Sequence, residues 1–516
     1  MEGTIWAFLP AVIAIILALV TKQVYVSLFL GILVGALMYA GGDPLKAFFT
    51  LYQVMSEKVG GNTPIIVFLV ILGILVVLMQ KSGGAMAYGN WAGKKIKSKG
   101  GALAATAGLG CLIFVDDYFN CLTVGSVMRP VTDKFKISRA KLAYIIDATA
   151  APVCIIAPIS SWAAAVSGEL EGDGLMVFIK TIPFNVYALL TLVMVFTLCF
   201  IKFDFAKMKK NEHIAETTGD LFAGETEDAE EKNELAANPK GKVRHLLIPV
   251  VVLILCCIGG MLYTGFFYNW DTGLIGSELQ SSSVIEAFSN CDAGMSLAIG
   301  STIALIIISI YYMIARVVSF KEITSSFTSG FKAMVPAILI LTFAWSISGI
   351  MGAKGGYLDA QSFVQNNLAN SNFPQFLFPA IFFILAGAIA FATGTSWGTF
   401  GVLVPIAVTI LGGSGTMAIL TVSATLGGAV FGDHISPISD TTILASAGAQ
   451  CNHVDHVNTQ LPYAGLIAGI SAVSYIFAGL AASIGSFVSC LVMWGVALAL
   501  FAGAVLVIRY LNRAKG

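Results

Sequence analysis

Residues 433–442 read DHISPISDTT, and this stretch decides how the chain is interpreted. It places two carboxylates, an imidazole, several hydroxyl groups and a helix-breaking proline between two apolar runs, 418–431 and 443–449. Ionisable side chains inside a bilayer are costly, and those that occur there usually have a function. In a membrane protein, this stretch would therefore mark a site that handles something polar.

The composition predicts such a membrane protein. Of the 516 residues, 57% are hydrophobic and only 11% are charged, whereas soluble domains carry about 25% charged residues. A helix that crosses the ~30 Å hydrocarbon core needs about 20 mostly apolar residues. Apolar runs close to this length recur at 5–20, 24–40, 64–79, 102–115, 142–156, 175–201, 246–263, 295–314, 334–351, 376–392, 400–411, 417–431, 461–479 and 488–508. We therefore predict an all-α polytopic membrane protein that is surrounded by the lipid bilayer.

The distribution of charge predicts the orientation. The totals are uninformative, because 29 Lys and Arg balance 29 Asp and Glu. Lys and Arg are enriched in the cytoplasmic loops of membrane proteins. They gather here at 81–99, 134–141, 202–210, 316–332 and 509–515. We predict a multi-pass protein of the cell (inner or plasma) membrane, with these basic loops and the C-terminus in the cytoplasm.

A polar, acidic stretch at 212–234 divides the chain. Its composition is typical of a solvated linker, with a regulatory segment as the alternative. We predict an N-terminal transmembrane repeat at 1–205, an acidic cytoplasmic linker at 206–243 and a C-terminal transmembrane repeat at 244–516.

The two halves resemble each other in the order of their motifs. Each has a polar break, DDYFN at 116–120 and TGTSWGT at 393–399. Each break is followed by a proline, a loop, an apolar run and a second proline beside serines, APISS at 157–161 and SPISD at 436–440. This order predicts a re-entrant hairpin followed by a broken helix in each half.

The charge rule gives the two repeats opposite orientations. The first hairpin would return to the basic loop at 134–141, and the second to the uncharged turn at 412–416. Inverted repeats with interrupted helices are the architecture in which secondary transporters place substrate and ion near the midplane. Backbone freed by a break is tolerated there only where it faces protein or a wet cavity. The predicted fold therefore has two inverted-topology repeats.

The residues GDHISPISDTT at 432–442, with ATGTSWGT at 392–399 upstream, resemble the NhaC family of Na⁺/H⁺ antiporters in the ion transporter superfamily. The resemblance implies a secondary active transporter that exchanges Na⁺ for H⁺ by alternating access, and a homodimer. It leaves a Na⁺- or H⁺-coupled carrier of an amino acid or organic anion as the alternative. The expected partners are therefore a small inorganic cation or a small organic solute, and no nucleic acid.

Acids and hydroxyls of the 433–442 stretch form the first predicted ion site. Carboxylates, freed carbonyls and hydroxyls are the hard oxygen ligands that suit a dehydrated Na⁺. The alternative is that the acids cap helix ends or pair with a buried base. An imidazole beside a carboxylate would make transport sensitive to pH, unless it only bonds a backbone group. The predicted ion- or proton-binding residues here are Asp433 and Asp440, which would hold Na⁺, with Ser436, Thr441 and His434.

Three acids of the first half are predicted to bind an ion or a proton. Asp116 and Asp117 lie side by side at the first break, where close, desolvated acids would share a proton. A salt bridge to Arg129 or Lys141 is the alternative. Asp147 lies in an apolar run, where it would be a ligand or would bond the hydroxyl of a neighbouring threonine or serine, Thr149 or Ser160.

A cargo site is predicted between the two breaks. The start of a half-helix offers N–H groups and a positive dipole end, which favour a carboxylate. The competing explanation for the glycines at this break, Gly394 and Gly398, is close helix packing. The predicted substrate-binding residues are Ser160, Ser161, Trp162, Thr395, Ser396 and Trp397.

Other classes of function lack their residues. The chain has no P-loop, no G-x-S-x-G elbow and no H-E-x-x-H motif, so we expect no enzyme and no cofactor besides the coupling ions Na⁺ and H⁺. Cys451, His453, Asp455 and His456 could suggest zinc, but capping of a helix end is favoured. An ion channel is the alternative from another class, because hairpin breaks also line selectivity filters.

Overall fold

The computed structural model describes residues 3–21, 23–170, 174–201, 203–224, 238–269, 274–276, 279–289, 291–351, 357–360, 362–363, 374–412 and 415–514. Within these ranges the chain is almost entirely helical. The helices of the first half are η1 (Ile5–Phe8), α1 (Leu9–Thr21), α2 (Val24–Tyr39), α3 (Pro44–Gly61), α4 (Thr63–Lys81), α5 (Gly84–Lys95), α6 (Lys99–Leu112), α7 (Asp117–Lys134), α8 (Arg139–Ala148), α9 (Ala151–Cys154), α10 (Ser161–Glu169), α11 (Gly174–Thr181), η2 (Ile182–Phe184), α12 (Val186–Phe200) and α13 (Ala206–Thr218).

The second half is helical apart from one small antiparallel ladder. Its elements are α14 (Arg244–Phe267), β1 (Tyr268–Asn269), β2 (Leu274–Ile275), α15 (Val284–Ser289), α16 (Ala293–Ile314), α17 (Phe320–Met351), η3 (Gln375–Leu377), α19 (Phe378–Thr393), α20 (Ser396–Leu411), α21 (Thr416–Ile435), α22 (Asp440–Ala449), α23 (His453–Ala481) and α24 (Ser486–Ala514). In the ladder, Tyr268 pairs with Ile275 and Asn269 with Leu274.

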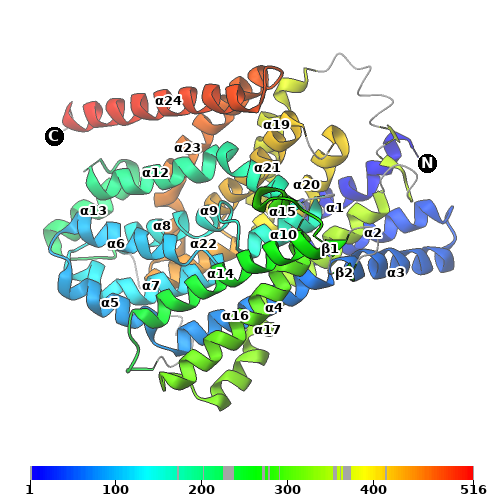
Figure 1. Ribbon diagram of the computed structural model, residues 1–516. Helices are drawn as coiled ribbons and strands as arrows, with labels where there is room; N and C mark the ends of the chain where they lie inside the picture. The colour runs from blue at the N-terminus through cyan, green and yellow to red at the C-terminus, as the bar shows by residue number, and fades with distance from the viewer. Residues whose placement is uncertain are drawn as a thin grey trace.

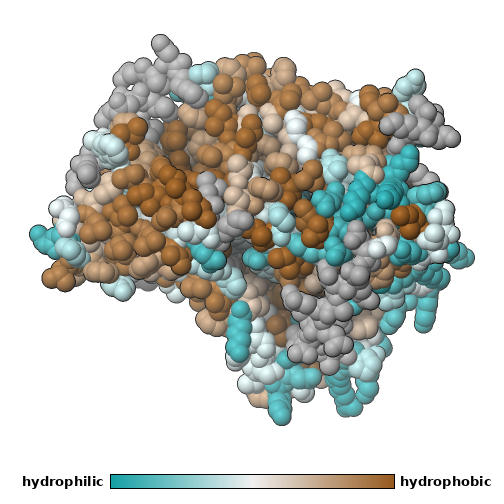
Figure 2. All heavy atoms as spheres, turned by 180° about the vertical axis from the view of Figure 1, so that it is seen from behind, coloured by the Kyte–Doolittle hydropathy of each residue, from teal (hydrophilic) through white to brown (hydrophobic). Residues whose placement is uncertain are grey.

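The prediction of a polytopic α-helical membrane protein is confirmed. Within the described residues, seven helices are long and apolar enough to cross a membrane, or up to nine if each of two bent pairs is one span. One of these pairs, α11 with η2 and then α12, bends by 49°. Figure 2 shows apolar side chains over much of one face, with hydrophilic side chains gathered toward one side and the lower edge. Such a surface suits contact with lipid.

The broken helices lie inside the molecule and the long apolar helices lie around them (Figure 1). The most apolar window of α21 is 89% buried, whereas that of α24 is only 22% buried. Polar breaks are tolerated at bilayer depth only where protein surrounds them. The central position of α21 therefore protects the part of the chain that most needs it.

Glycine lets the interior helices approach closely. A β-carbon on Gly125 of α7 would lie 2.3 Å from the carbonyl carbon of Gly448 in α22, so these two helices cross backbone to backbone. Helices in membranes commonly associate through such small residues, because packing replaces the hydrophobic effect there. This contact joins an element of the first half to one of the second.

The segment predicted as a solvated linker begins with a packed helix, α13. Glu212 is buried there, and its carboxylate lies 2.6 Å from the ammonium nitrogen of Lys99 and 3.7 Å from that of Lys141. Lys141 also pairs with Asp204 at 2.7 Å. We call Lys99, Lys141, Asp204 and Glu212 the α13 ion-pair network. Composition alone made this region look solvated, whereas its acids pair with lysines of α6 and α8; the rest of the acidic stretch, 225–237, lies outside the described residues.

Candidate functional site

The tip between α19 and α20 meets the break between α21 and α22. Gly394 ends α19 with φ of +70°, a conformation that glycine adopts without strain. A β-carbon at this position would lie 2.4 Å from the carbonyl oxygen of Ile438. Thr395 then caps α20 by accepting a hydrogen bond from the N–H of Gly398 at 3.3 Å. Gly394 is therefore needed both for the turn and for the contact between the two breaks.

The break between α21 and α22 is held by its own serines. Ser436 donates to the carbonyl of Phe391 in α19 at 2.7 Å, and Ser439 accepts from the N–H of Thr442 at 3.2 Å. The intervening Pro437 has no N–H to lose. Ser436, predicted as an ion ligand, thus joins the break to the neighbouring hairpin.

Asp433 lies at the centre of these contacts. Its side chain is buried, and its Oδ2 accepts hydrogen bonds from Thr441 Oγ1 at 2.7 Å and from Ser396 Oγ at 3.2 Å. Ser396 belongs to α20 and Thr441 to α22. One carboxylate oxygen therefore joins the hairpin to the broken helix through hydroxyl groups alone.

The second acid of the stretch lies elsewhere. Asp440 is exposed at the first residue of α22, whereas Asp433 is buried in the last turn of α21. An acid in the first turn of a helix is stabilised by the helix dipole. The structure does not bring the predicted pair together as two buried ligands.

The first break has the same design. Asp116 caps α7 by accepting from the N–H of Phe119 at 2.9 Å. Asp117 is fully buried, and its Oδ2 accepts from the indole N–H of Trp162 at 3.1 Å. The alternative of a salt bridge to Lys141 is wrong, because Lys141 belongs to the α13 ion-pair network.

The two breaks lie close to each other. The ring centroids of Trp162 in α10 and Trp397 in α20 are 5.7 Å apart, and both rings contact Phe400. Asp433 is near enough to Asp117 for their charges to repel. Five buried side chains from the two halves of the chain thus surround one region.

The predicted cargo residues divide into three sets. Trp162 and Ser396 donate to the buried acids Asp117 and Asp433. Ser160 and Thr395 cap their own helices, since their side chains accept from the N–H groups of Ala163 and Gly398. Trp397 Nε1 is buried and has no hydrogen-bond partner among the described residues, whereas Ser161 Oγ lies beside the Asp116 carboxylate. The indole N–H of Trp397 is therefore the donor that these contacts leave free.

Asp147 is bonded to neither of the hydroxyls proposed from sequence. Thr149 donates to carbonyls of its own helix, and Ser160 to those of Cys154 and Ala157. The carboxylate instead accepts hydrogen bonds from residues near the C-terminal end of the chain, Thr442, His456 and Gln460.

The His434 ring bonds a tyrosine of α12 and not the neighbouring Asp433 carboxylate. Its Nδ1 lies 2.9 Å from the hydroxyl of Tyr187 in α12, and its backbone carbonyl accepts from Gln460 at 2.7 Å. The ring is buried. The structure therefore joins His434 to the surrounding helices α12 and α23 as well as to the break.

Several residues of this site were missed from sequence. Asn120 donates its amide hydrogens to carbonyl groups at the ends of α6 and α8, those of Gly110, Ile113 and Thr149. Gln460 and Tyr187 had no local signal. His456 and Gln460 are four residues apart on one helix, which places them on one face. That spacing was the available clue.

The residues considered for zinc point in different directions. His453 contacts the carbonyl of Pro437 at 2.7 Å, Asp455 accepts from Asn211, and His456 reaches Asp147. No group of three or more His, Cys, Asp or Glu that could hold a metal occurs in the described part of the chain.

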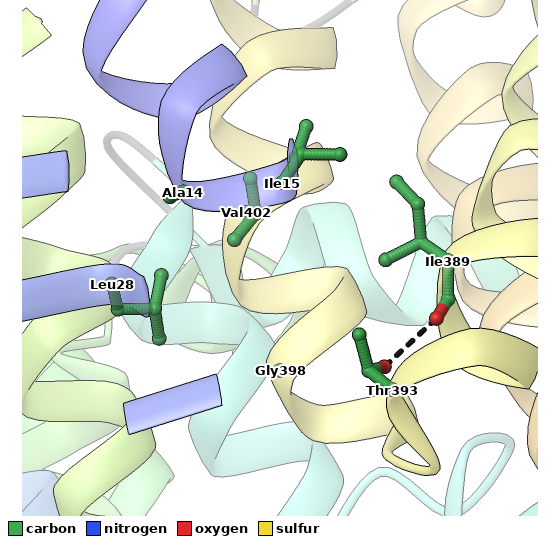
Figure 3. Close-up of a pocket in the computed structure, with 7 residues that line it drawn as sticks. All are labelled: Ala14, Ile15, Leu28, Ile389, Thr393, Gly398 and Val402. Atoms are coloured by element: carbon green, nitrogen blue, oxygen red, sulfur yellow. Dashed lines mark hydrogen bonds between the residues drawn. The ribbon is translucent and has the colours of Figure 1, made fainter. Parts of the chain in front are cut away.

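A separate apolar pocket lies on the other side of α20 (Figure 3). Gly398 and Val402 lie roughly opposite Ser396 and Phe400 around the helix, at 100° per residue. The threonine of this pocket donates to the carbonyl of Ile389 at 2.8 Å. The pocket is lined by Ala14, Ile15, Leu28, Ile389, Thr393, Gly398 and Val402. It faces α1 and α2 and holds none of the acids.

The buried region surrounds its two acids with neutral donors. Asp117 and Asp433 are held by hydroxyl, indole and backbone donors. Hydroxyls are also ligands for hard cations and can rotate to accept or donate. A carboxylate in this setting can take up either a proton or a small cation.

Comparisons with known proteins agree with this chemistry. Residues 163–480 match the model of the Na⁺/H⁺ antiporter family. An uncharacterised protein of Haemophilus influenzae is 39% identical over 93% of this chain and 91% of its own length. The malate-2H⁺/Na⁺-lactate antiporter of Bacillus subtilis is 32% identical over 28% of this chain and 30% of its own length. The arginine/ornithine antiporter ArcD of Halobacterium salinarum is 41% identical over 22% of this chain and 24% of its own length. The resemblance predicted from residues 392–399 and 432–442 is confirmed, and the chain belongs to the Na⁺/H⁺ antiporter family.

Proposed function

We propose that this secondary transporter exchanges Na⁺ for H⁺, with the cation bound at the Asp433 carboxylate. The observation that carries the proposal is the pair of hydroxyls, Ser396 from the hairpin and Thr441 from the broken helix, on one buried carboxylate oxygen. Na⁺ would replace the hydroxyl hydrogens at this oxygen, and the hydroxyl oxygens would turn toward the ion. Asp440 and Ser436 are left out of this ligand set, because one is exposed and the other bonds Phe391.

Proton exchange would take place at the neighbouring acids. Asp117 feels the negative charges of both Asp116 and Asp433, so an added cation at Asp433 would favour loss of a proton nearby. Competition between one cation and one proton for a shared cluster of acids is sufficient for antiport. In this scheme Asp116 and Asp117 are the proton-exchanging groups.

Alternating access would move the interrupted helices against the outer ones. Each half of the chain contains a helix pair joined at a polar tip, α6 with α7 and α19 with α20. Inverted repeats of this kind would let each tip open the site to one side of the membrane in turn. A Na⁺ ion held between α20 and α22 would be released when these elements separate.

Flux measurements in proteoliposomes test the proposal. A pH gradient is imposed, and its dissipation is followed after addition of Na⁺, Li⁺ or K⁺ to the wild type, Asp433→Asn and the matched surface variant Asp440→Asn. We expect Na⁺ to dissipate the gradient in the wild type and Asp440→Asn, but not in Asp433→Asn. A wild type that is silent with every cation would refute exchange of inorganic cations. A flux that does not saturate would instead indicate a channel.

An amino acid carrier is the second candidate. The indole N–H of Trp397 is buried and has no hydrogen-bond partner among the described residues. It lies near the acid Asp117, because the Trp162 ring contacts Trp397 and donates to Asp117. Donors suit a carboxylate and an acid suits an ammonium group. The two antiporters named above, which match only part of this chain, exchange malate with lactate and arginine with ornithine. Activity that appears only when one organic solute is added with Na⁺ would favour this candidate.

A further inference from the structure

Asp147 of α8 is the centre of a second polar cluster. Its Oδ2 accepts from Gln460 Nε2 at 2.7 Å, from Thr442 Oγ1 at 3.1 Å and from His456 Nε2 at 3.3 Å. All four residues are fully buried. The donors come from α22 and α23, so the cluster joins a broken helix of the first half to two helices of the second.

The hydrogen bonds fix where the protons are. An ionised carboxylate only accepts, and the two donors Thr442 and Gln460 on one oxygen fit that form. His456 must then carry a proton on Nε2. Three atoms of the cluster have no hydrogen-bond partner within the described ranges: Asp147 Oδ1, His456 Nδ1 and Gln460 Oε1. The cluster can therefore accept one more proton, on Asp147 Oδ1 or on His456 Nδ1, without losing a bond that it already makes.

Two side chains connect this cluster to Asp433. Thr442 Oγ1 has one hydrogen and lies 3.1 Å from Asp147 Oδ2 and 3.2 Å from the backbone carbonyl of Asp433. Gln460 Nε2 has two hydrogens and donates to both Asp147 and the carbonyl of His434. A proton on Asp147 Oδ1 weakens Oδ2 as an acceptor, and a proton on His456 Nδ1 draws Oδ2 toward the imidazolium, so in both cases the shared Thr442 hydrogen shifts toward the Asp433 carbonyl. Protonation of the cluster is thus transmitted to the last turn of α21.

We propose that Asp147 and His456 form a second proton-binding site, separate from the cation site at Asp433 and coupled to it through Thr442 and Gln460. The proton comes from water, and binding changes the charge of the pair from −1 to 0 without forming or breaking a bond to carbon. The groups that face Asp147 are Asp433 and His434 of α21, His456 of α23, Tyr187 of α12 and Cys121 of α7. This inference rests on the proposed exchange at Asp433.

Counting protons released on Na⁺ binding tests the inference without transport. Purified protein in detergent is placed in weakly buffered solution with a pH-sensitive dye, and NaCl is added, with choline chloride as the salt control. Radiolabelled Na⁺ gives the number of ions bound in the same sample. The count is made at several pH values for the wild type, Asp147→Asn and His456→Gln, each first checked for a monodisperse gel-filtration profile.

We expect both variants to bind Na⁺ but to release fewer protons per ion than the wild type, with a flatter dependence on pH. Equal release from the wild type and both variants at every pH would overturn the inference and leave the proposed function standing. A wild type that binds no Na⁺ would overturn the proposed function, and the inference with it. Because His456→Gln keeps a side-chain amide near the position of Nε2, it separates loss of titration from loss of packing.

The coupling through Thr442 has its own matched test. Thr442→Val removes the shared hydroxyl, whereas Thr425→Val removes one that donates to Thr421 within α21. We expect the Na⁺ affinity of Thr442→Val to lose its dependence on pH, and that of Thr425→Val to keep it. The same pH dependence in both variants would show that Thr442 does not couple the two sites.

Discussion

Two buried groups of acids in this molecule are satisfied in opposite ways. In the α13 ion-pair network, Glu212 and Asp204 pair with the ammonium groups of Lys99 and Lys141 at 2.6 to 2.7 Å. Around the breaks, Asp117 and Asp433 are held by an indole, backbone N–H groups and hydroxyls. Acids that already have a lysine have no need of an external cation. The difference therefore separates a structural contact from the site that we propose to bind an ion.

The comparison predicts opposite consequences for stability and function. Removing one partner of a buried ion pair leaves an uncompensated charge. Removing the charge of a carboxylate that is held by neutral donors leaves no such orphan. We expect mutations in the α13 ion-pair network to unfold the protein more easily and mutations at Asp433 to abolish exchange in a folded protein.

The largest effect is expected from Lys141→Met. This change removes the ammonium group that lies 2.7 Å from Asp204 and leaves Glu212 paired with Lys99. Loss of one partner of a buried pair destabilises by about 3 to 5 kcal/mol. Thermal unfolding in detergent should show a clearly lower midpoint, while Lys321→Met, at an exposed position of α17, should match the wild type. Equal midpoints for the two variants would mean that the network does not stabilise the fold.

Asp433→Asn should affect binding more than stability. We expect the apparent Na⁺ affinity to fall about 100-fold, which equals about 2.8 kcal/mol. The melting midpoint should stay near that of the wild type, because the amide oxygen still accepts from Ser396 and Thr441. Binding of radiolabelled Na⁺ and thermal unfolding, measured on one preparation, would check the expected affinity and the expected melting midpoint. A large loss of stability would place Asp433 with the structural acids.

A smaller, pH-dependent effect is expected from Glu212→Gln. Burial raises the pKa of Glu212, but the charges of Lys141 and Lys99 outweigh it and hold the pKa below its ordinary value of 4.5. A lowered pKa in the folded state means that the contribution is present above the unfolded value and is lost as the pH falls through the folded one. A hydrogen-bonded charge of this kind contributes about 2 kcal/mol.

The difference in melting midpoint between the wild type and Glu212→Gln should therefore be largest near neutral pH and decrease below about pH 4.5. On the alkaline side, burial lowers the pKa of Lys99, but Glu212 more than offsets this and raises it above 10.5. No loss from Lys99 is expected until the pH exceeds that value. A difference that stays constant from acid to neutral pH would show that the charge of Glu212 is not what matters.

Much of the fold could be predicted from sequence because its signals are local. Apolar runs specify helices, and a proline beside serines specifies a break, so α21, α22 and their polar junction were expected. Helices with more polar stretches outside these motifs, α3, α5 and α13, were not, because hydropathy cannot distinguish them from loops. α13 illustrates the reason: the lysine partners of Glu212 come from α6 and α8, far along the chain.

The candidate site could be predicted only in part, for the same reason. The contact of Asp433 with Thr441 could be expected, because its neighbours in sequence are also its neighbours in space. Asp147 was found as a buried acid, but its partners were wrong: Gln460 lies 313 positions away and Thr442 295 positions away. Pairings between the two halves depend on how the helices pack, and a single sequence carries no local trace of them.

Asp440→Asn should have the smallest effect and gives the sharpest test of how the two acids of one motif differ. Sequence made Asp433 and Asp440 equal candidates, but Asp440 is exposed in the first turn of α22. An exposed acid at that position contributes about 0.3 to 1 kcal/mol through the helix dipole. We expect Na⁺ affinity to change less than about threefold, which is under 0.7 kcal/mol. Because both variants lose one charge from the same ten residues, a loss equal to that of Asp433→Asn would show that Asp440 also binds the ion and that burial does not select the ligand.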